Sequence, residues 1–188
     1  MAKLVSKTYG DALFEIAAEA ERIDAFYEEA EGVRTVLKEN TQISKLMSHP
    51  KIVKEEKIQI IENIFKGRIS DEMVGLMRMI VDKGHFAEMD SVLSYFITEV
   101  KESKHIGTAY VTTAVELSEE QKAQVTDKLI RTTNYVEFEM HYDVDPSLIG
   151  GMVIRIKDRV VDSSIKTKLY DLSRELSKIQ LKVGECAP

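Results

Sequence analysis

The spacing of apolar residues predicts helices through almost all of the first 105 residues. Apolar side chains recur there at every third or fourth position, which places them on one face of a helix. A break is expected near His49, because the proline at position 50 disfavours a helical conformation in the residue before it. The pattern therefore predicts a bundle of six helices, over residues 3–20, 23–39, 43–47, 52–67, 71–83 and 86–100.

Near Gly107 the pattern changes to that of strands. Residues 136–144 alternate apolar and polar side chains, as in a strand with one buried and one solvated face. Ser118 and Gln121 match a capping box at the start of a helix that continues through Ile130. The remaining expected elements are strands at 108–115, 152–156 and 160–161, a turn containing Asp145, Pro146, Gly150 and Gly151, and a last helix whose narrow apolar stripe runs from 165 to 179.

These elements predict an α+β protein with two domains. An all-α six-helix bundle over residues 1–105 is followed by a small α/β domain over residues 106–188. The order strand, helix, strand, strand, helix suggests one sheet backed by two helices.

Composition narrows the functional classes. The chain has 188 residues, 26 of them basic and 32 acidic, so its formal net charge of -6 argues against binding to nucleic acid phosphates. No apolar run reaches the roughly 18–20 residues that span a bilayer, so we expect no direct insertion into a membrane. The first residues lack an apolar core with a cleavage site, and the single Cys186 fits a reducing compartment.

The sequence also lacks the spacings that catalysis and cofactor binding need. The four histidines are scattered, and none lies two to four residues from another His or Cys, so we predict no metal site. Gly150 and Gly151 precede a strand and belong to no phosphate-binding motif, so they are better explained as turn residues. Cys186 lies in the C-terminal tail without a base beside it. We therefore predict no catalytic residues and no cofactor.

One helix suggests a binding function. The segment 71–83 is apolar around much of its circumference, through Met73, Val74, Gly75, Leu76, Met77, Met79, Ile80 and Val81. It is either a central helix enclosed by the bundle or a helix whose second face lines a groove for an amphipathic partner helix. Between Asp11 and Glu31 the chain also carries eight acidic residues and one arginine. Such a stretch is typical of a solvated face and also suits the steering of a basic partner.

Several motifs in this order resemble one family. They are Tyr-Gly-Asp-Ala-Leu at residues 9–13, the segment 76–85 that ends in Lys-Gly-His, Ala-Val-Glu-Leu-Ser-Glu-Glu-Gln at 114–121, and Asp-Pro-Ser-Leu-Ile-Gly-Gly at 145–151 before an apolar strand. Together they resemble the delta subunit of bacterial F-type ATP synthase, a relative of the mitochondrial oligomycin-sensitivity-conferring protein. Two residues depart from the family pattern: Gly10 stands where alanine is usual, and His85 where arginine is usual.

The resemblance implies a non-catalytic stator subunit on the cytoplasmic side of the cell membrane. In such a subunit the N-terminal domain binds the N-terminal helix of an alpha subunit of the catalytic head. The C-terminal domain binds the C-terminal end of the b-type stalk subunit, so that proton-driven rotation is coupled to ATP synthesis. Carried over by position, the groove for the alpha subunit is lined by Tyr9, Ala12, Leu13, Ile16, Gly75, Leu76, Met79, Ile80 and Lys83.

Two other classes of protein compete with this one. The first is a helical regulatory or RNA-binding module, which the acidic composition disfavours. The second is a small enzyme with its site between the domains, which would need converging titratable residues that the sequence does not show. No self-association surface is evident, so we expect a monomer when the protein is isolated.

Overall fold

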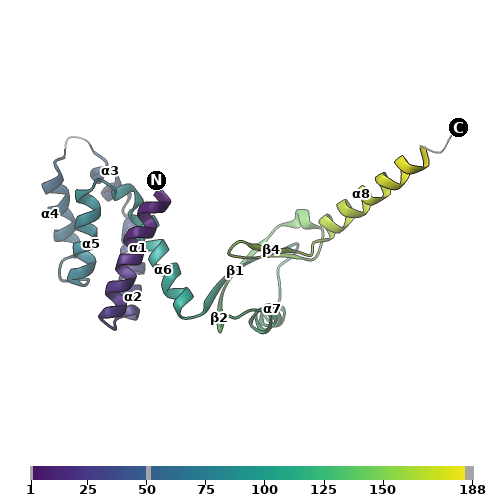
Figure 1. Cartoon of the computed structure of the whole chain (residues 1–188), viewed down its shortest axis with the longest axis horizontal. Helices are drawn as coiled ribbons and strands as arrows, with labels where there is room; N and C mark the ends of the chain where they lie inside the picture. The colour runs from purple at the N-terminus through teal and green to yellow at the C-terminus, as the bar shows by residue number, and fades with distance from the viewer. Residues whose placement is uncertain (1, 50–51, 185–188) are drawn as a thin grey trace. The chain divides into compact units, whose positions relative to one another are not determined.

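A computed structural model of the chain describes residues 2–49 and 52–184 (Figure 1). The fold is α+β, as predicted: helices form the first half, and a four-stranded sheet lies in the second half. The chain divides between Lys104 and His105 into two compact units, and each is described by itself.

The first unit is helical throughout. Its elements are α1 (Ala2–Glu19), α2 (Ile23–Glu39), α3 (Thr41–Met47), α4 (Lys54–Phe65), α5 (Asp71–Asp82), a short 3-10 turn η1 (Phe86–Glu88) and α6 (Met89–Ser103). Most bounds lie within two residues of the prediction. The start of α4 is later, at Lys54, because Val53 is extended and leaves Ile52 outside the helix. Lys83 ends α5, and Gly84 follows in the left-handed conformation that glycine permits.

The core of this unit contains one apolar cluster drawn from α1 to α6. Phe26 of α2, Phe96 of α6 and Met77 of α5 are among its largest fully buried side chains. Close packing of such side chains supplies most of the stability of amphipathic helices, which are marginal when isolated.

The contact between α1 and α6 explains the unusual Gly10. A Cβ atom at this position would overlap the ring of Tyr95, so glycine lets the aromatic ring lie directly on the backbone of α1. The Tyr95 hydroxyl donates a hydrogen bond to Asp11 Oδ1 at 3.0 Å, which holds the ring in place. Burial, and then the contact with Asp11, raises the pKa of Tyr95 to about 12, so the hydroxyl keeps its proton at neutral pH.

The second unit contains β1 (Ile106–Thr113), α7 (Glu119–Thr132), β2 (Glu137–Val144), a 3-10 turn η2 (Pro146–Leu148), β3 (Met152–Ile156), β4 (Arg159–Asp162) and α8 (Ile165–Gly184). The strand order is β2-β1-β3-β4. β1 and β2 are parallel and are joined through α7, as a parallel pair requires, and the other two pairs are antiparallel.

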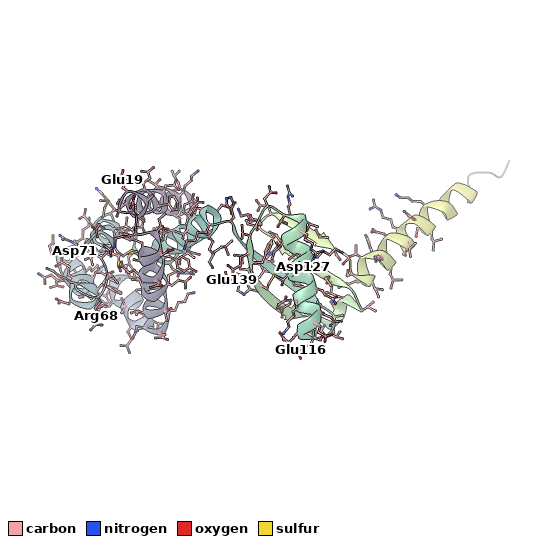
Figure 2. The ribbon with its side chains drawn as sticks, turned by 90° about the horizontal axis from the view of Figure 1, so that it is seen from below. Glu19, Arg68, Asp71, Glu116, Asp127 and Glu139 are labelled. Carbon is pink, nitrogen blue, oxygen red and sulfur yellow. The ribbon has the colours of Figure 1, made fainter. Side chains whose placement is uncertain are left out.

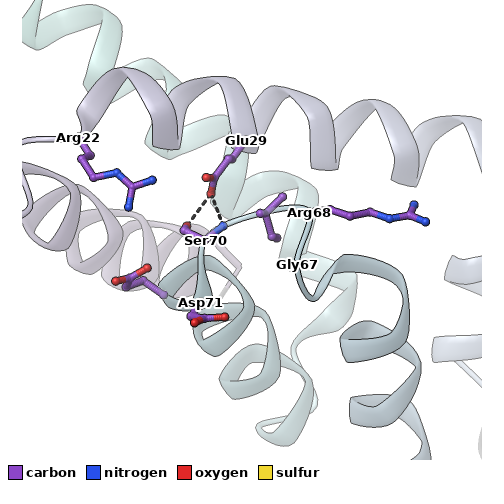
Figure 3. A pocket seen from close by; sticks show the side chains of 8 residues that line it. Arg22, Glu29, Gly67, Arg68, Ser70 and Asp71 are labelled. Atoms are coloured by element: carbon purple, nitrogen blue, oxygen red, sulfur yellow. Dashed lines mark hydrogen bonds between the residues drawn. The ribbon is translucent and has the colours of Figure 1, made fainter.

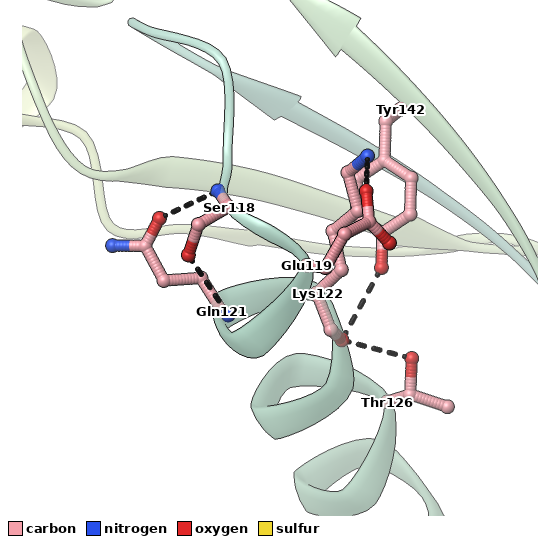
Figure 4. A network of polar contacts seen from close by, with 6 residues as sticks. All are labelled: Ser118, Glu119, Gln121, Lys122, Thr126 and Tyr142. Atoms are coloured by element: carbon pink, nitrogen blue, oxygen red, sulfur yellow. Dashed lines mark hydrogen bonds and ion pairs between the residues drawn. The ribbon is translucent and has the colours of Figure 1, made fainter.

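Helix α7 covers one face of this sheet. Leu129 packs with Ala109 of β1 and Phe138 of β2 in a small core. The predicted capping box is confirmed: Ser118 Oγ accepts a hydrogen bond from the Gln121 amide, and the Ser118 amide donates to Gln121 Oε1 (Figure 4). Near the same helix start, the Tyr142 hydroxyl donates to the Lys122 carbonyl at 3.4 Å.

Helix α8 differs from the expectation that two helices back the sheet. It meets the rest of its unit chiefly at η2, near its first turn, and its apolar side chains at Leu169, Leu172 and Leu176 stay exposed. The sheet is therefore covered by α7, and α8 keeps an unpartnered apolar stripe.

The Gly10 contact predicts an inverted response to alanine. In an exposed helix interior Gly→Ala gains up to about 1 kcal/mol, but Gly10→Ala forces a methyl group into the Tyr95 ring, and such overpacking costs about 1–3 kcal/mol. We expect Gly10→Ala to lower the free energy of unfolding in urea. The control Gly32→Ala, in α2 with nothing near its Cβ position, should raise it. A gain for both variants would contradict the role of Gly10.

Candidate functional site

The first candidate surface lies between α1 and α5. Arg22, just after α1, lines the same hollow as Asp71 and Glu72 at the start of α5. At the other end, η1 follows α5 and contacts α1. The two helices are in contact and therefore run antiparallel, and the strip between them can receive a third helix.

The structure divides the nine residues predicted for this groove into two groups. Met79 is 53% exposed and Ile16 38%, Gly75 and Lys83 are exposed, and Tyr9 and Ala12 are half-buried. Leu13, Leu76 and Ile80 are buried in the core, so they lie beneath the exposed strip and are not part of its surface. The reason is helical geometry: Leu13 and Ile16 are three positions apart, so their side chains point about 60° apart around α1.

Gly75 is an exposed glycine of α5 with free space beside it. A Cβ atom at this position would meet no other atom within 4 Å, so packing inside the unit does not require glycine there. Glycine in a helix interior lowers stability by about 1 kcal/mol relative to alanine. Gly32 of α2 is open in the same way, so what sets Gly75 apart is its place on the α1–α5 surface, where it leaves room for close approach by another chain.

A polar hollow of about 520 Å³ lies where Arg22 and Glu29 meet the start of α5 (Figure 3). Its main contact is one that sequence reasoning missed. Glu29 Oε2 of α2 accepts hydrogen bonds from the Ser70 amide at 3.0 Å and from Ser70 Oγ at 2.6 Å. Ser70 is the N-cap residue of α5 but makes no capping bond with its own side chain, and the carboxylate of Glu29 accepts hydrogen bonds at the helix start instead.

The second candidate surface is the apolar stripe of α8. Leu172 is 55% exposed, and Leu169 and Leu176 are similarly open. These leucines follow one another at spacings of three and four residues, which is the seam spacing of paired helices. The predicted continuation at position 179 lies beyond the side chains that the structure describes.

The root of α8 is fixed by hydrogen bonds. Asp162 accepts from the Ser164 amide at 2.8 Å and from the Thr167 hydroxyl at 2.7 Å. These bonds, the amide first, hold the pKa of Asp162 below its usual value. The Ile165 amide donates to the Gly150 carbonyl at 2.9 Å, which ties the helix to the preceding turn.

The turn predicted from Asp145 to Gly151 lies against this root. The Asp145 carboxylate accepts from the Ser147 amide at 2.9 Å and from its hydroxyl, which lowers the pKa of Asp145. Pro146 opens η2. At Gly151 φ is +77°, and a Cβ atom would lie 2.5 Å from the Ser163 carbonyl oxygen, so a side chain cannot be accommodated there.

Two exposed features were not predicted. Ile149 is 64% exposed and has φ +66°, a conformation that β-branched residues rarely adopt. On the open face of the sheet, Tyr110 stacks on His141 with ring centroids 4.9 Å apart, and the Arg155 guanidinium lies 4.9 Å from the Tyr110 centroid. Cross-strand register brings these three together, and register is not readable from the period of one strand.

Within the described residues, no three His, Cys, Asp or Glu side chains converge as metal ligands would. Among the helices that could be searched there, none has the length and apolar character needed to cross a bilayer. Cys186 lies outside the residues that the structure describes.

Comparison with known proteins places the chain in one family. A family model described as ATP synthase delta (OSCP) subunit matches residues 5–176. ATP synthase subunit delta of Lachnoclostridium phytofermentans is 55% identical over 181 residues, covering 96% of this chain and all of the relative. The subunit of the same name from Desulforamulus reducens is 34% identical over 175 residues, or 93% and 96% of the two chains.

The fold also resembles a solved chain. A chain in the cryo-EM structure of the Toxoplasma gondii mitochondrial ATP synthase hexamer superposes with a TM-score of 0.73 at 17% identity, over 91% of this chain and 96% of that one.

The hydrogen bonds of Asp162 at the root of α8 can be tested by hydrogen exchange. Asp162→Ala should speed amide exchange in the first turns of α8 by roughly fivefold to tenfold, as expected for the loss of hydrogen bonds to a charged acceptor that holds Ser164 and Thr167. Asp171→Ala, an exposed acid within α8, is the matched control and should leave the exchange there unchanged.

The same bonds give a pH dependence. Because the pKa of Asp162 is lowered in the folded chain, its stabilising effect is full above the unfolded pKa of about 3.9 and is lost as the pH falls below it. Equal exchange in wild type and Asp162→Ala at pH 7 would contradict this account.

Proposed function

The chain belongs to the ATP synthase delta (OSCP) subunit family and is a stator subunit of an F-type ATP synthase, and we propose that it joins the catalytic head to the peripheral stalk through the two surfaces described above. The match spans nearly the whole chain, so the regulatory or RNA-binding alternative is set aside. We propose that the subunit has no catalytic role of its own and lies on the cytoplasmic side of the cell membrane, where its single cysteine suits a reducing compartment.

The α1–α5 groove is the proposed site for the N-terminal helix of an alpha subunit. Its apolar strip, Ile16 and Met79 above all, is accessible in the first unit. The open position of Gly75 allows the backbone of a docked helix to come close. An amphipathic helix laid in such a groove buries its apolar anchors, and a buried centre of this kind carries most of the affinity of an interface.

The stripe of α8 is the proposed site for the C-terminal end of the b-type stalk subunit. Leu169, Leu172 and Leu176 present a seam that a second helix can pack against, and full burial of one leucine contributes roughly 1.5–3 kcal/mol. The hydrogen bonds around Asp162 fix the direction of the helix start, so a load on α8 is passed to the sheet. Stiffness at this joint is what a stator requires.

The groove is tested by filling it. Gly75→Met should raise the stability of α5 by up to about 1 kcal/mol, because methionine favours helix and its Cβ atom would meet no other atom within 4 Å. The same change should weaken binding of the alpha-subunit N-terminal peptide at least tenfold, as measured by calorimetry. Gly32→Met, exposed on α2, is the matched control and should bind normally. Undiminished affinity in Gly75→Met would reject this groove.

The stalk site is tested by placing a charge on the stripe. Leu172→Asp should abolish binding of the soluble b-type subunit, because an unpaired carboxylate would be buried in the joint. Ser177→Asp, about 140° around α8 from Leu172, adds the same charge on another side and should bind as wild type. In membranes stripped of the subunit, only the control should restore proton pumping driven by ATP hydrolysis. Full coupling with Leu172→Asp would contradict the assignment.

A further inference from the structure

We infer that Ile149, in the turn between η2 and β3, is a binding residue for the stalk helix proposed to pack on α8. This inference rests on the proposed function of α8 and adds to it a residue that lies outside the helix. The occupant is the apolar face of an amphipathic helix, at the C-terminal end of the b-type subunit.

The backbone at Ile149 adopts a conformation that glycine enters readily and β-branched residues rarely do. Its φ is +66° and its ψ is -37°. Among the residues that the structure describes, the other non-glycine positions with positive φ are Glu21, His105 and Lys157, which are polar and exposed. Within those described ranges, Ile149 is therefore the one large apolar side chain held in such a conformation.

The fold of the second unit does not require isoleucine at this position. The side chain is 64% exposed, so packing within the unit does not account for it. The turn is held by other groups, because the Ile149 amide donates to the Pro146 carbonyl at 3.1 Å and the neighbouring Leu148 is buried. A single exposed apolar residue is ordinary on a protein surface, but backbone strain that serves no internal packing is typical of binding sites.

Ile149 lies beside the first residue of the α8 stripe. The next residue, Gly150, has no side chain, and a Cβ atom there would lie 2.7 Å from Cδ1 of Ile165. Ile165 therefore packs on the turn, yet it remains 41% exposed. It lies four positions before Leu169, on the same face of α8. The apolar stripe thus continues through Ile165 to the turn that carries Ile149.

This continuity identifies the occupant. Figure 2 shows the side chains of α8 standing clear of the sheet, so a partner helix can reach the stripe. Consecutive Cα atoms are about 3.8 Å apart, so Ile149 is one such step from the glycine on which Ile165 packs. A helix with its side chains is about 10–12 Å wide. A helix laid on Ile165 and Leu169 is therefore wide enough to cover Ile149 as well.

The experiment separates a role of Ile149 in binding from a role in folding, and it uses the full chain. Ile149→Gly should bind the soluble b-type subunit at least tenfold more weakly by calorimetry, because an apolar contact of the interface is lost. Its unfolding midpoint in urea should be no lower than that of wild type, since glycine adopts this φ without strain. A lower midpoint would show that the side chain supports its own unit, and would overturn the inference.

Val136→Gly is the matched control. Val136 is 71% exposed, has no positive φ and precedes β2, roughly 25 Å along the strand from the turn. This variant should lose stability, because glycine increases the entropy of the unfolded chain, and yet bind within twofold of wild type. Undiminished binding by Ile149→Gly, or equal weakening in both variants, would overturn the inference.

The Leu172→Asp variant distinguishes this failure from that of the proposed function. If Leu172→Asp loses binding while Ile149→Gly retains it, the stalk site on α8 stands and only the role of Ile149 is rejected. If Leu172→Asp binds as wild type does, the stalk site and the role of Ile149 are both rejected.

Discussion

In a small bundle, neighbouring helices can bury only part of the surface around each helix, and this limit determines which apolar residues of the first unit stay exposed. Helix α5 is apolar around most of its surface, yet its neighbours bury only Met73, Met77, Ile80 and the residues beside them. Helices in contact on one side cannot also enclose the other, so Met79 and the backbone at Gly75 stay open. The helix is therefore central in the bundle, and one strip of it is bare.

The second unit differs, because it holds a long helix, α8, that makes few packing contacts. Most of α8 has no tertiary partner among the described residues, so its orientation depends on its first turn. Asp162, Gly150 and Gly151 concentrate hydrogen bonds and close backbone contacts at that point. The turn from Asp145 to Gly151 holds the start of α8. A side chain at Gly150 or Gly151 would collide with Ile165 or Ser163, and Gly151 also has a positive φ.

Local patterns could be predicted from the sequence because they depend on neighbours in the chain. The helical periods, the alternation along β2 and the capping box of Ser118 and Gln121 are of this kind. Contacts between distant segments could not be predicted. Glu29 reaches Ser70 across 41 positions, and Tyr95 lies on Gly10 across the α1–α6 contact. The groove remains a prediction, and burial divides its residues, because the sequence gives no means of dividing an apolar face between core and surface at Leu13 and Ile80.

The bare leucines of α8 also have a meaning for a copy that has not found its complex. Apolar side chains in a row on a water-facing helix favour non-specific association. Unassembled copies would therefore be lost to aggregation and proteolysis. The same leucines that suit α8 for binding a partner therefore expose a lone copy to aggregation.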